Sequence, residues 1–291
     1  MDRVVIVGSG PAGISAAIYV LRAGLKATIV SSGLGALEKA DKVENYYGFE
    51  QPISGKELLA AGIAQARRLG AVIVQGEVVN LAHDGEQFRV TGSANAVEAD
   101  SVILATGSSR ALPRIAGFPK FESSGVSFCA VCDGFFYRGK DVAVLGCCEY
   151  AAHEARELLP LASSVTLVTN GIRPIDDLPE GLRVDTRPIA ELRGDDALEA
   201  IAFADGGVLP VRGLFVAQGV AGSADLAKKV GAETVGNRIA VGEDMQSSVP
   251  LLFAAGDCTG GMMQIAKAVY EGARAGTEAV RALRARKKGR A

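Results

Sequence analysis

The segment Gly8-Ser9-Gly10-Pro11-Ala12-Gly13 constrains the fold of this chain more than any other stretch. It follows the apolar run Val4–Val7, which has the composition of a buried strand, and precedes the Ala-rich run Ile14–Ala23, which has helical character. In such a unit the first glycine allows the turn, the second lets the backbone approach a pyrophosphate, and the third permits close helix packing. The helix N-terminus also favours phosphate charge. The segment predicts a dinucleotide site, with a purely structural glycine turn as the alternative.

One part of the usual dinucleotide site is missing. An acidic residue about 20 residues after the glycines normally binds the ribose. The second predicted strand, Ala27–Val30, continues instead into Ser31 and Ser32. Ribose binding by a carboxylate is therefore not expected at this strand.

The strand–turn–helix pattern occurs a second time. Asp141–Leu145 is a predicted strand, Gly146 opens a turn, Tyr150–Leu161 is a predicted helix and Val165–Val168 the next strand. Further predicted elements are a helix at Gly55–Leu69, strands at Ala71–Val74, Gln87–Thr91, Ser101–Ala105 and Leu251–Ala255, and a closing helix from Ile265. This alternation predicts an α/β fold with mainly parallel, doubly wound sheets and two Rossmann-like dinucleotide-binding domains. The length of 291 residues, about twice that of a typical domain, agrees with it.

Charge and composition exclude several classes of function. A formal net charge of -2 argues against a nucleic-acid binder, which usually has a strongly basic domain or stripe. No apolar run is long enough to span a bilayer, and the residues after Met1 do not resemble an export signal. With five cysteines and no such signal, a reducing cytoplasm is the expected location, where a cysteine pair is more often catalytic or metal-binding than structural.

Cys129 and Cys132 are separated by two residues and followed by Asp133-Gly134. Cysteines at this spacing can form a small disulfide ring, and the spacing commonly lowers the pKa of one thiol so that a thiolate is available for dithiol exchange. The alternative is half of a tetrahedral zinc site, which needs two further ligands. The remaining candidates for such ligands are His83, His153, Cys147, Cys148 and Cys258. We expect a redox-active pair and no metal.

Taken together, these residues resemble the low-molecular-weight thioredoxin reductase family along nearly the whole chain. The resemblance is carried by motifs in the family's order: the N-terminal glycines, Val43–Phe49, Ile53-Ser54-Gly55, Ala105-Thr106-Gly107, Cys129–Gly134 and Phe253–Asp257. It implies a fold of the pyridine nucleotide disulfide oxidoreductase type, in which residues 1–114 and 242–291 bind FAD. Residues 115–241 would form an inserted second dinucleotide-binding-like domain that carries the cysteine pair.

The resemblance also implies site residues. The flavin site would comprise Gly8, Gly10, Pro11, Ala12, Gly13, Asn45, Ala105, Thr106, Gly107, Gly256, Asp257, Gln264 and Ile265. Two departures, Ala36 where the family often has Gln and Met263 where it has Arg, affect only details of the flavin contacts. Cys132 would lie nearest the flavin and Cys129 would attack the partner's disulfide. Asp133 would donate or accept the proton, with a solvated turn aspartate as the alternative.

The second fingerprint departs from the family, where it binds NADPH. Here it reads Gly146-Cys147-Cys148-Glu149-Tyr150-Ala151, so Cys148 replaces the glycine that would approach the pyrophosphate, and Glu149 adds negative charge. The family's His-Arg-Arg cluster for the 2′-phosphate is reduced to Arg173 in Thr169–Arg173. We therefore expect NADPH not to bind productively. Cys147 and Cys148 are interpreted as small buried fillers, with a second redox pair as the alternative.

A divergent branch of the family, the ferredoxin-dependent flavin thioredoxin reductases, also lacks both NADPH motifs, and the sequence looks like that branch. Under this hypothesis ferredoxin is the electron donor and thioredoxin the acceptor. The basic tail Arg281–Arg290 could steer an acidic ferredoxin, although a solvated helix end explains it as well. The alternatives are an NADPH-dependent thioredoxin reductase, a flavin-dependent dithiol oxidase and a non-catalytic redox sensor. A homodimer is expected by resemblance.

Overall fold

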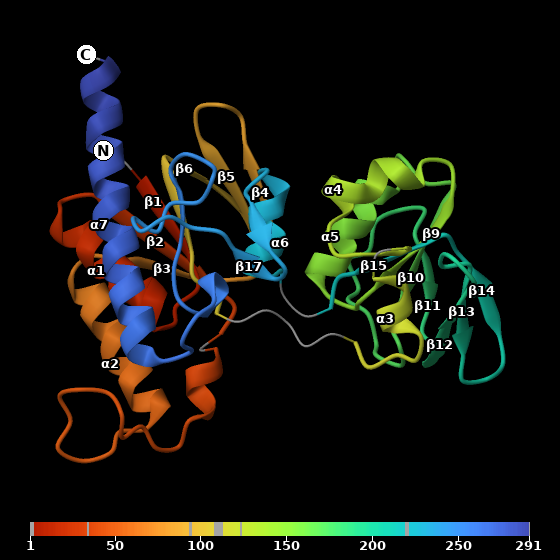
Figure 1. Ribbon diagram of the computed structural model, residues 1–291, viewed down its shortest axis with the longest axis horizontal. Coiled ribbons are helices and arrows are strands. Elements are labelled where there is room, and N and C mark those ends of the chain that lie inside the picture. The colour runs from red at the N-terminus through yellow and green to blue at the C-terminus, as the bar shows by residue number, and fades with distance from the viewer. Residues whose placement is uncertain are drawn as a thin grey trace. The chain divides into compact units, whose positions relative to one another are not determined.

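The computed structural model describes residues 3–33, 35–92, 95–107, 113–122, 124–218 and 221–290. The chain forms two compact units, Met1–Ser109 with Gly222–Ala291, and Arg110–Ala221. In Figure 1 the first unit is coloured from both ends of the scale, red and blue. The segment that follows the second unit returns to the first and adds a strand to the sheet of the first unit. No helix among the described residues is long and apolar enough to cross a membrane.

The first unit is built on a parallel sheet of five strands in the order β18-β7-β1-β2-β3. Its strands are β1 (Arg3–Val7), β2 (Lys26–Ser31), β3 (Val72–Gln75), β7 (Ser101–Leu104) and β18 (Leu252–Ala254). Helices α1 (Pro11–Arg22), α2 (Gly55–Arg68) and α7 (Ile265–Arg290) accompany it (Figure 1). The central strand β1 is buried from Val4 to Val7, as expected for a parallel strand covered on both faces.

Small residues allow α1 and α7 to pack at close range. A Cβ at Gly272 would meet the carbonyl of Ala12, and one at Gly276 would meet that of Ala16. The Ser15 hydroxyl donates to the Val269 carbonyl at 2.7 Å. The last helix of the chain therefore fixes the fingerprint helix in place.

Helix α2 begins where the motif Ile53-Ser54-Gly55 occurs. The Ser54 hydroxyl accepts the Glu57 N–H at 3.2 Å, and the Glu57 carboxylate accepts the Ser54 N–H at 3.1 Å. These reciprocal bonds form a capping box. The Ser54 hydroxyl, followed by its N–H, lowers the pKa of Glu57. The motif thus marks a helix start in the first unit.

The second unit has its own five-stranded parallel sheet, in the order β11-β10-β9-β15-β8. Its strands are β8 (Val126–Ser127), β9 (Asp141–Leu145), β10 (Ser164–Val168), β11 (Arg183–Asp185) and β15 (Gly213–Val216). Helices α3 (Phe118–Phe121), α4 (Ala130–Asp133) and α5 (Glu149–Leu158) belong to this unit, and α5 ends before the predicted Leu161. The two parallel sheets confirm the predicted α/β fold with two Rossmann-like units.

Two three-stranded antiparallel sheets extend the units, and the predicted strand Gln87–Thr91 belongs to the first of them. One comprises β4 (Val78–His83), β5 (Phe88–Gly92) and β6 (Ala96–Ala99), and the other β12 (Ile189–Arg193), β13 (Ala200–Phe203) and β14 (Val208–Pro210). The short elements are η1 (Ala36–Lys39), η2 (Gly134–Tyr137), η3 (Asp257–Thr259), β16 (Thr234–Val235) and β17 (Arg238–Ile239).

The chain returns to the first unit at Gly222, about 20 residues before the expected boundary near residue 242. Helix α6 (Ser223–Lys229) packs against β4 and β17, and its Leu226 and Ala227 are buried. The Ser223 N–H donates to the Thr106 hydroxyl at 3.0 Å. These contacts attach residues 222–241 to the first unit.

Candidate functional site

The geometry of the turn between β1 and α1 requires glycine at two of its three glycine positions. Gly8 has φ +111°, and a Cβ there would meet the Ala105 carbonyl; a Cβ at Gly13 would meet the Gly8 carbonyl. Gly10 differs, because a Cβ there would meet nothing within 4 Å. Gly10 is also the N-cap of α1, and Pro11 is at the first position of the helix. The structure leaves open space beside Gly10, at the positive end of a helix, where a pyrophosphate fits.

Serine hydroxyls lie where other dinucleotide sites usually have a ribose-binding carboxylate. The Ser9 hydroxyl donates to the Ser31 hydroxyl at 2.8 Å, and Ser31 donates to the Gly33 carbonyl at 2.7 Å. Ser31 is the last residue of β2. A ligand at this strand end would meet neutral hydroxyls and backbone.

The predicted flavin residues come together at one edge of the first sheet. Gly8 follows β1, Ala105 follows β7 and Gly256 lies just beyond β18, and these three strands are neighbours. Ligands of open α/β sheets bind outside the carboxyl ends of strands. A Cβ at Gly107, which has φ +83°, would likewise meet nothing within 4 Å. The edge offers open backbone of the kind that a dinucleotide contacts.

Two further predicted residues, Asn45 and Gln264, are 219 positions apart yet joined by a hydrogen bond of 2.8 Å from Asn45 Nδ2 to Gln264 Oε1. Gln264 directly precedes Ile265, the first residue of α7, and its carbonyl accepts the Ala268 N–H at 3.0 Å. The bond therefore connects the loop before α2 with the start of α7. Both side chains belong to exposed residues that a ligand can reach.

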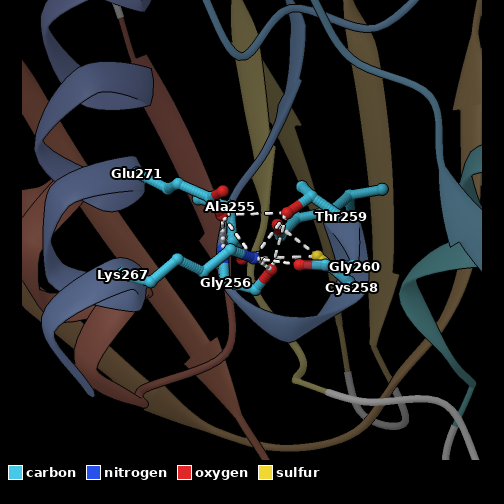
Figure 2. A network of polar contacts seen from close by, with 8 residues as sticks. Ala255, Gly256, Cys258, Thr259, Gly260, Lys267 and Glu271 are labelled. Atoms are coloured by element: carbon cyan, nitrogen blue, oxygen red, sulfur yellow. Dashed lines mark hydrogen bonds and ion pairs between the residues drawn. The ribbon is translucent and has the colours of Figure 1, made fainter. Parts of the chain in front are cut away.

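A Lys267–Glu271 network holds the loop that carries Asp257 (Figure 2). The Lys267 ammonium donates to the Gly256 carbonyl at 2.7 Å and to the Thr259 hydroxyl at 2.9 Å, and pairs with Glu271 at 3.0 Å. It also donates to the Gly260 carbonyl. The Glu271 carboxylate accepts the Gly256 N–H at 2.8 Å. Sequence reasoning missed this pair, although a Lys–Glu spacing of four on a predicted helix is a recognisable signal.

We expect Lys267→Met to lower the free energy of unfolding by about 3 kcal/mol, because the substitution leaves the Glu271 charge buried and unpaired. Only 13% of the Lys267 and 12% of the Glu271 side chain is exposed. Urea denaturation measures the loss. The matched control is Arg89→Met, which breaks an exposed pair with Glu98 in the same unit and should cost less than about 1 kcal/mol. Equal losses in both variants would show that the Lys267 network adds nothing beyond a surface pair.

Cys129 and Cys132 form a disulfide in the second unit, with their Cα atoms 5.3 Å apart. Cys129 is the N-cap of the short helix α4 and is 3% exposed, whereas Cys132 is exposed. The Cys132 N–H donates to Cys129 Sγ at 3.1 Å. Among the described residues, no three His, Cys, Asp or Glu side chains are arranged to hold a metal ion. The pair is thus a disulfide between one buried and one exposed residue.

Asp133 is tied to the disulfide segment. Its carboxylate accepts a hydrogen bond of 2.7 Å from the Ser127 hydroxyl, which in turn accepts the Cys129 N–H at 3.1 Å. The pKa of Tyr137 is raised by burial and then by the negative charge of Asp133. The half-buried Asp133 carboxylate is thus bonded to the segment that carries the disulfide. Ser127, which connects the two, was not identified from sequence.

The second fingerprint is a strand–turn–helix unit whose turn differs from the first. A Cβ at Gly146 would meet the Ala217 carbonyl, so the glycine needed for packing is present. Cys148 is the N-cap of α5, and its sulfur lies 3.9 Å from the Ala217 carbonyl. Cys147 and Cys148 are not joined in a disulfide, and both are half-buried, whereas buried fillers were expected. Burial, followed by the charge of Cys148, raises the pKa of Cys147.

The region after β10 offers little to a phosphate. Asn170 adopts φ +51°, and its side chain accepts the Ile189 N–H at 2.7 Å. The guanidinium of Arg173 donates to Asp176 at 3.0 Å in an ion pair whose two side chains are exposed. Within Gly146–Ala151 the one charged side chain is the negative Glu149, in the first turn of α5.

Comparisons with known proteins agree with this geometry. The family model for pyridine nucleotide-disulphide oxidoreductases matches residues 2–272. The thioredoxin reductase of Aquifex aeolicus is 35% identical over 273 residues, which are 87% of this chain and 84% of that protein.

Two solved structures are similar over almost the whole chain. The atypical thioredoxin reductase of Desulfovibrio vulgaris Hildenborough is 40% identical, with 98% of both chains covered and a TM-score of 0.91. A ferredoxin-flavin thioredoxin reductase of Clostridium acetobutylicum is 31% identical, with 98% of both chains covered and a TM-score of 0.71.

Proposed function

The chain belongs to the pyridine nucleotide-disulphide oxidoreductase family and within it to the thioredoxin reductases, and we propose that it reduces thioredoxin through FAD and the Cys129–Cys132 disulfide. The observation that carries the proposal is the disulfide itself, with a carboxylate, Asp133, bonded into the same segment. Thiol–disulfide exchange requires a disulfide that opens to two thiols.

The open edge of the first unit fits FAD. Gly10 and Pro11 at the start of α1 would face its pyrophosphate, while Gly8, Ala12 and Gly13 would shape the turn and its packing. The loops at Asn45, Ala105–Gly107, Gly256–Asp257 and Gln264–Ile265 would hold the remainder. When bound, FAD supplies the electron pair that opens a disulfide. The family resemblance and the unfilled space beside Gly10 support this choice of cofactor.

We expect Gly10→Val to weaken FAD binding by about 10- to 100-fold, because the added side chain fills the space that a pyrophosphate would occupy. The fold should persist, since a Cβ at Gly10 meets no protein atom within 4 Å. Titration of the apoprotein with FAD measures the dissociation constant. Gly289→Val, at another open glycine far along α7, should bind FAD as the parent does. Unchanged affinity in Gly10→Val would remove the glycine turn from the site.

The chain's own residues carry out the exchange with thioredoxin. Reduction of the disulfide takes up two electrons and two protons and leaves two thiols. The Cys129 thiolate then attacks the thioredoxin disulfide, forming a mixed disulfide and releasing one thioredoxin thiolate. Attack by Cys132 on Cys129 restores the disulfide and releases the second. Asp133 accepts and returns a proton in these steps. Because Cys129 is 3% exposed, its attack requires the segment to open towards thioredoxin.

A single-turnover experiment tests the reductase function without a physiological donor. The FAD-loaded protein is reduced with dithionite, freed of excess reductant, and mixed with oxidised thioredoxin under anaerobic conditions. We expect about two thioredoxin dithiols per fully reduced chain, since the FAD and the disulfide each carry one electron pair. A thioredoxin that stays oxidised would contradict the proposal.

We propose reduced ferredoxin as the donor in place of NADPH. The support is the second fingerprint, where Cys148 and Glu149 replace the features that bind a pyrophosphate and Arg173 is paired with Asp176. One similar structure is a ferredoxin-flavin thioredoxin reductase, which agrees with this choice. The basic residues within Arg281–Arg290 would attract an acidic ferredoxin over long range. A cytoplasmic homodimer is the assembly that the family resemblance favours.

A further inference from the structure

Helix α5, which opens the second fingerprint, contacts the redox-active segment through two side chains. The Tyr150 hydroxyl donates to the Phe128 carbonyl at 3.3 Å, and the Glu154 carboxylate accepts the Ala130 N–H at 2.7 Å. Residues four apart lie on the same face of a helix. The contacts therefore fall on the two neighbours of Cys129, one on each side. Helices α4 and α5 lie together within the unit (Figure 1).

The Glu154 contact is the stronger of the two. Glu154 is 1% exposed, and burying a carboxylate to this extent is costly unless hydrogen bonds compensate. The Ala130 N–H is the first amide of α4, which has no acceptor within its own helix. The hydrogen bond between them gives this N–H an acceptor and the buried carboxyl group a donor. Glu154 therefore anchors the start of α4 to α5.

The position of the start of α4 determines which N–H group donates a hydrogen bond to the Cys129 sulfur. Cys129 is the N-cap of α4, and its sulfur accepts the Cys132 N–H at 3.1 Å. In the oxidised protein the covalent bond also holds the two residues together. After reduction only the backbone geometry keeps that N–H near the sulfur, where it stabilises a thiolate. A stabilised thiolate favours the reduced form of the pair and raises its reduction potential.

We propose that Glu154 is a positioning residue of the redox centre: through the Ala130 N–H it keeps the Cys129 sulfur beside the Cys132 N–H in the reduced protein, and so raises the reduction potential of the pair. The inference rests on the proposed reductase function and concerns the same site. It also gives α5 a role in a unit whose nucleotide features have been lost.

Two substitutions separate the reach of the Glu154 side chain from its charge. Glu154→Asp keeps the charge but withdraws it by one methylene, while Glu154→Gln keeps the length and the acceptor oxygen without the charge. The FAD-loaded proteins are equilibrated in thiol–disulfide buffers of graded potential. After alkylation, mass spectrometry of the peptide that contains Cys129 and Cys132 gives the fraction reduced.

We expect Glu154→Asp to shift the equilibrium about tenfold towards the disulfide, which is about 30 mV for a two-electron couple. Glu154→Gln should stay within about threefold of the parent. Glu157→Gln is the matched control, because Glu157 lies on the same helix, is partly exposed and pairs with His153. It should also stay close to the parent.

The inference is overturned if Glu154→Asp stays close to the parent, or if Glu154→Gln shifts as far as Glu154→Asp. Hydrogen exchange at the Ala130 amide of the parent tests the same contact without a substitution. Protection in both the oxidised and the reduced protein is expected, and exchange as fast as in an exposed amide after reduction overturns the inference. Neither experiment uses thioredoxin or an electron donor. A parent pair that never opens in these buffers would instead contradict the reductase function, and this inference with it.

Discussion

Replacing either Cys129 or Cys132 with serine is expected to lower thioredoxin reduction by about 10³-fold or more, because disulfide exchange needs both sulfurs. Without Cys129 no thiolate attacks the thioredoxin disulfide. Without Cys132 the mixed disulfide with Cys129 cannot be resolved. The single-turnover assay with dithionite-reduced protein measures the loss, and the Cys132→Ser variant should accumulate the mixed disulfide.

The double variant Cys147→Ser/Cys148→Ser is the matched control. These two cysteines lie in the same unit and take no part in the disulfide. We expect the control to reduce thioredoxin at the parental rate. If it loses activity as Cys132→Ser does, the electrons leave through a second pair, and the assignment of Cys129 and Cys132 as the sole exchange centre is wrong.

NADPH is expected to bind with a dissociation constant above about 1 mM, which corresponds to less than about 4 kcal/mol of binding free energy. The first turn of α5 carries Glu149, and a phosphate placed there meets a like charge. Cys148 stands where a glycine would let the backbone approach. The one arginine after β10, Arg173, is paired with Asp176.

Isothermal titration calorimetry of the FAD-loaded protein with NADPH measures the dissociation constant. A parallel titration with NADH serves as the comparison. Absorbance spectra of the same mixtures under anaerobic conditions show whether the visible absorbance of the flavin decreases. Saturable micromolar binding together with bleaching would show that the atypical fingerprint still takes NADPH, and would favour an NADPH-dependent reductase.

Local patterns explain why much of the fold could be predicted. Gly8–Gly13 combines the end of a strand, a turn and the start of a helix within a short stretch; Gly8 and Gly13 have steric reasons that the structure bears out, and Gly10 borders open space. Once parallel strands are assigned, their carboxyl ends meet at one edge, which brings Gly8, Ala105 and Gly256 together. The family resemblance added Asn45 and Gln264, whose mutual bond spans 219 positions.

Contacts between distant segments explain what could not be predicted. The bond from Ala130 to Glu154 and the one from Ser127 to Asp133 depend on how a helix and a loop pack, which no spacing in the sequence specifies. The return of the chain to the first unit at Gly222 also depends on a contact between segments far apart in the sequence. It depends on Ser223 bonding to Thr106, which lies 117 positions earlier. Hydrophobic periodicity predicts single helices and strands and does not predict such pairs.

Anaerobic steady-state turnover of thioredoxin disulfide tests the central claim most directly. The FAD-loaded protein is supplied with oxidised thioredoxin and either ferredoxin kept reduced by a ferredoxin-reducing system or NADPH alone. The account predicts sustained formation of thioredoxin dithiol with reduced ferredoxin, dependent on Cys129 and Cys132, and no turnover above background with NADPH. Turnover with NADPH alone, or none with reduced ferredoxin, would contradict it.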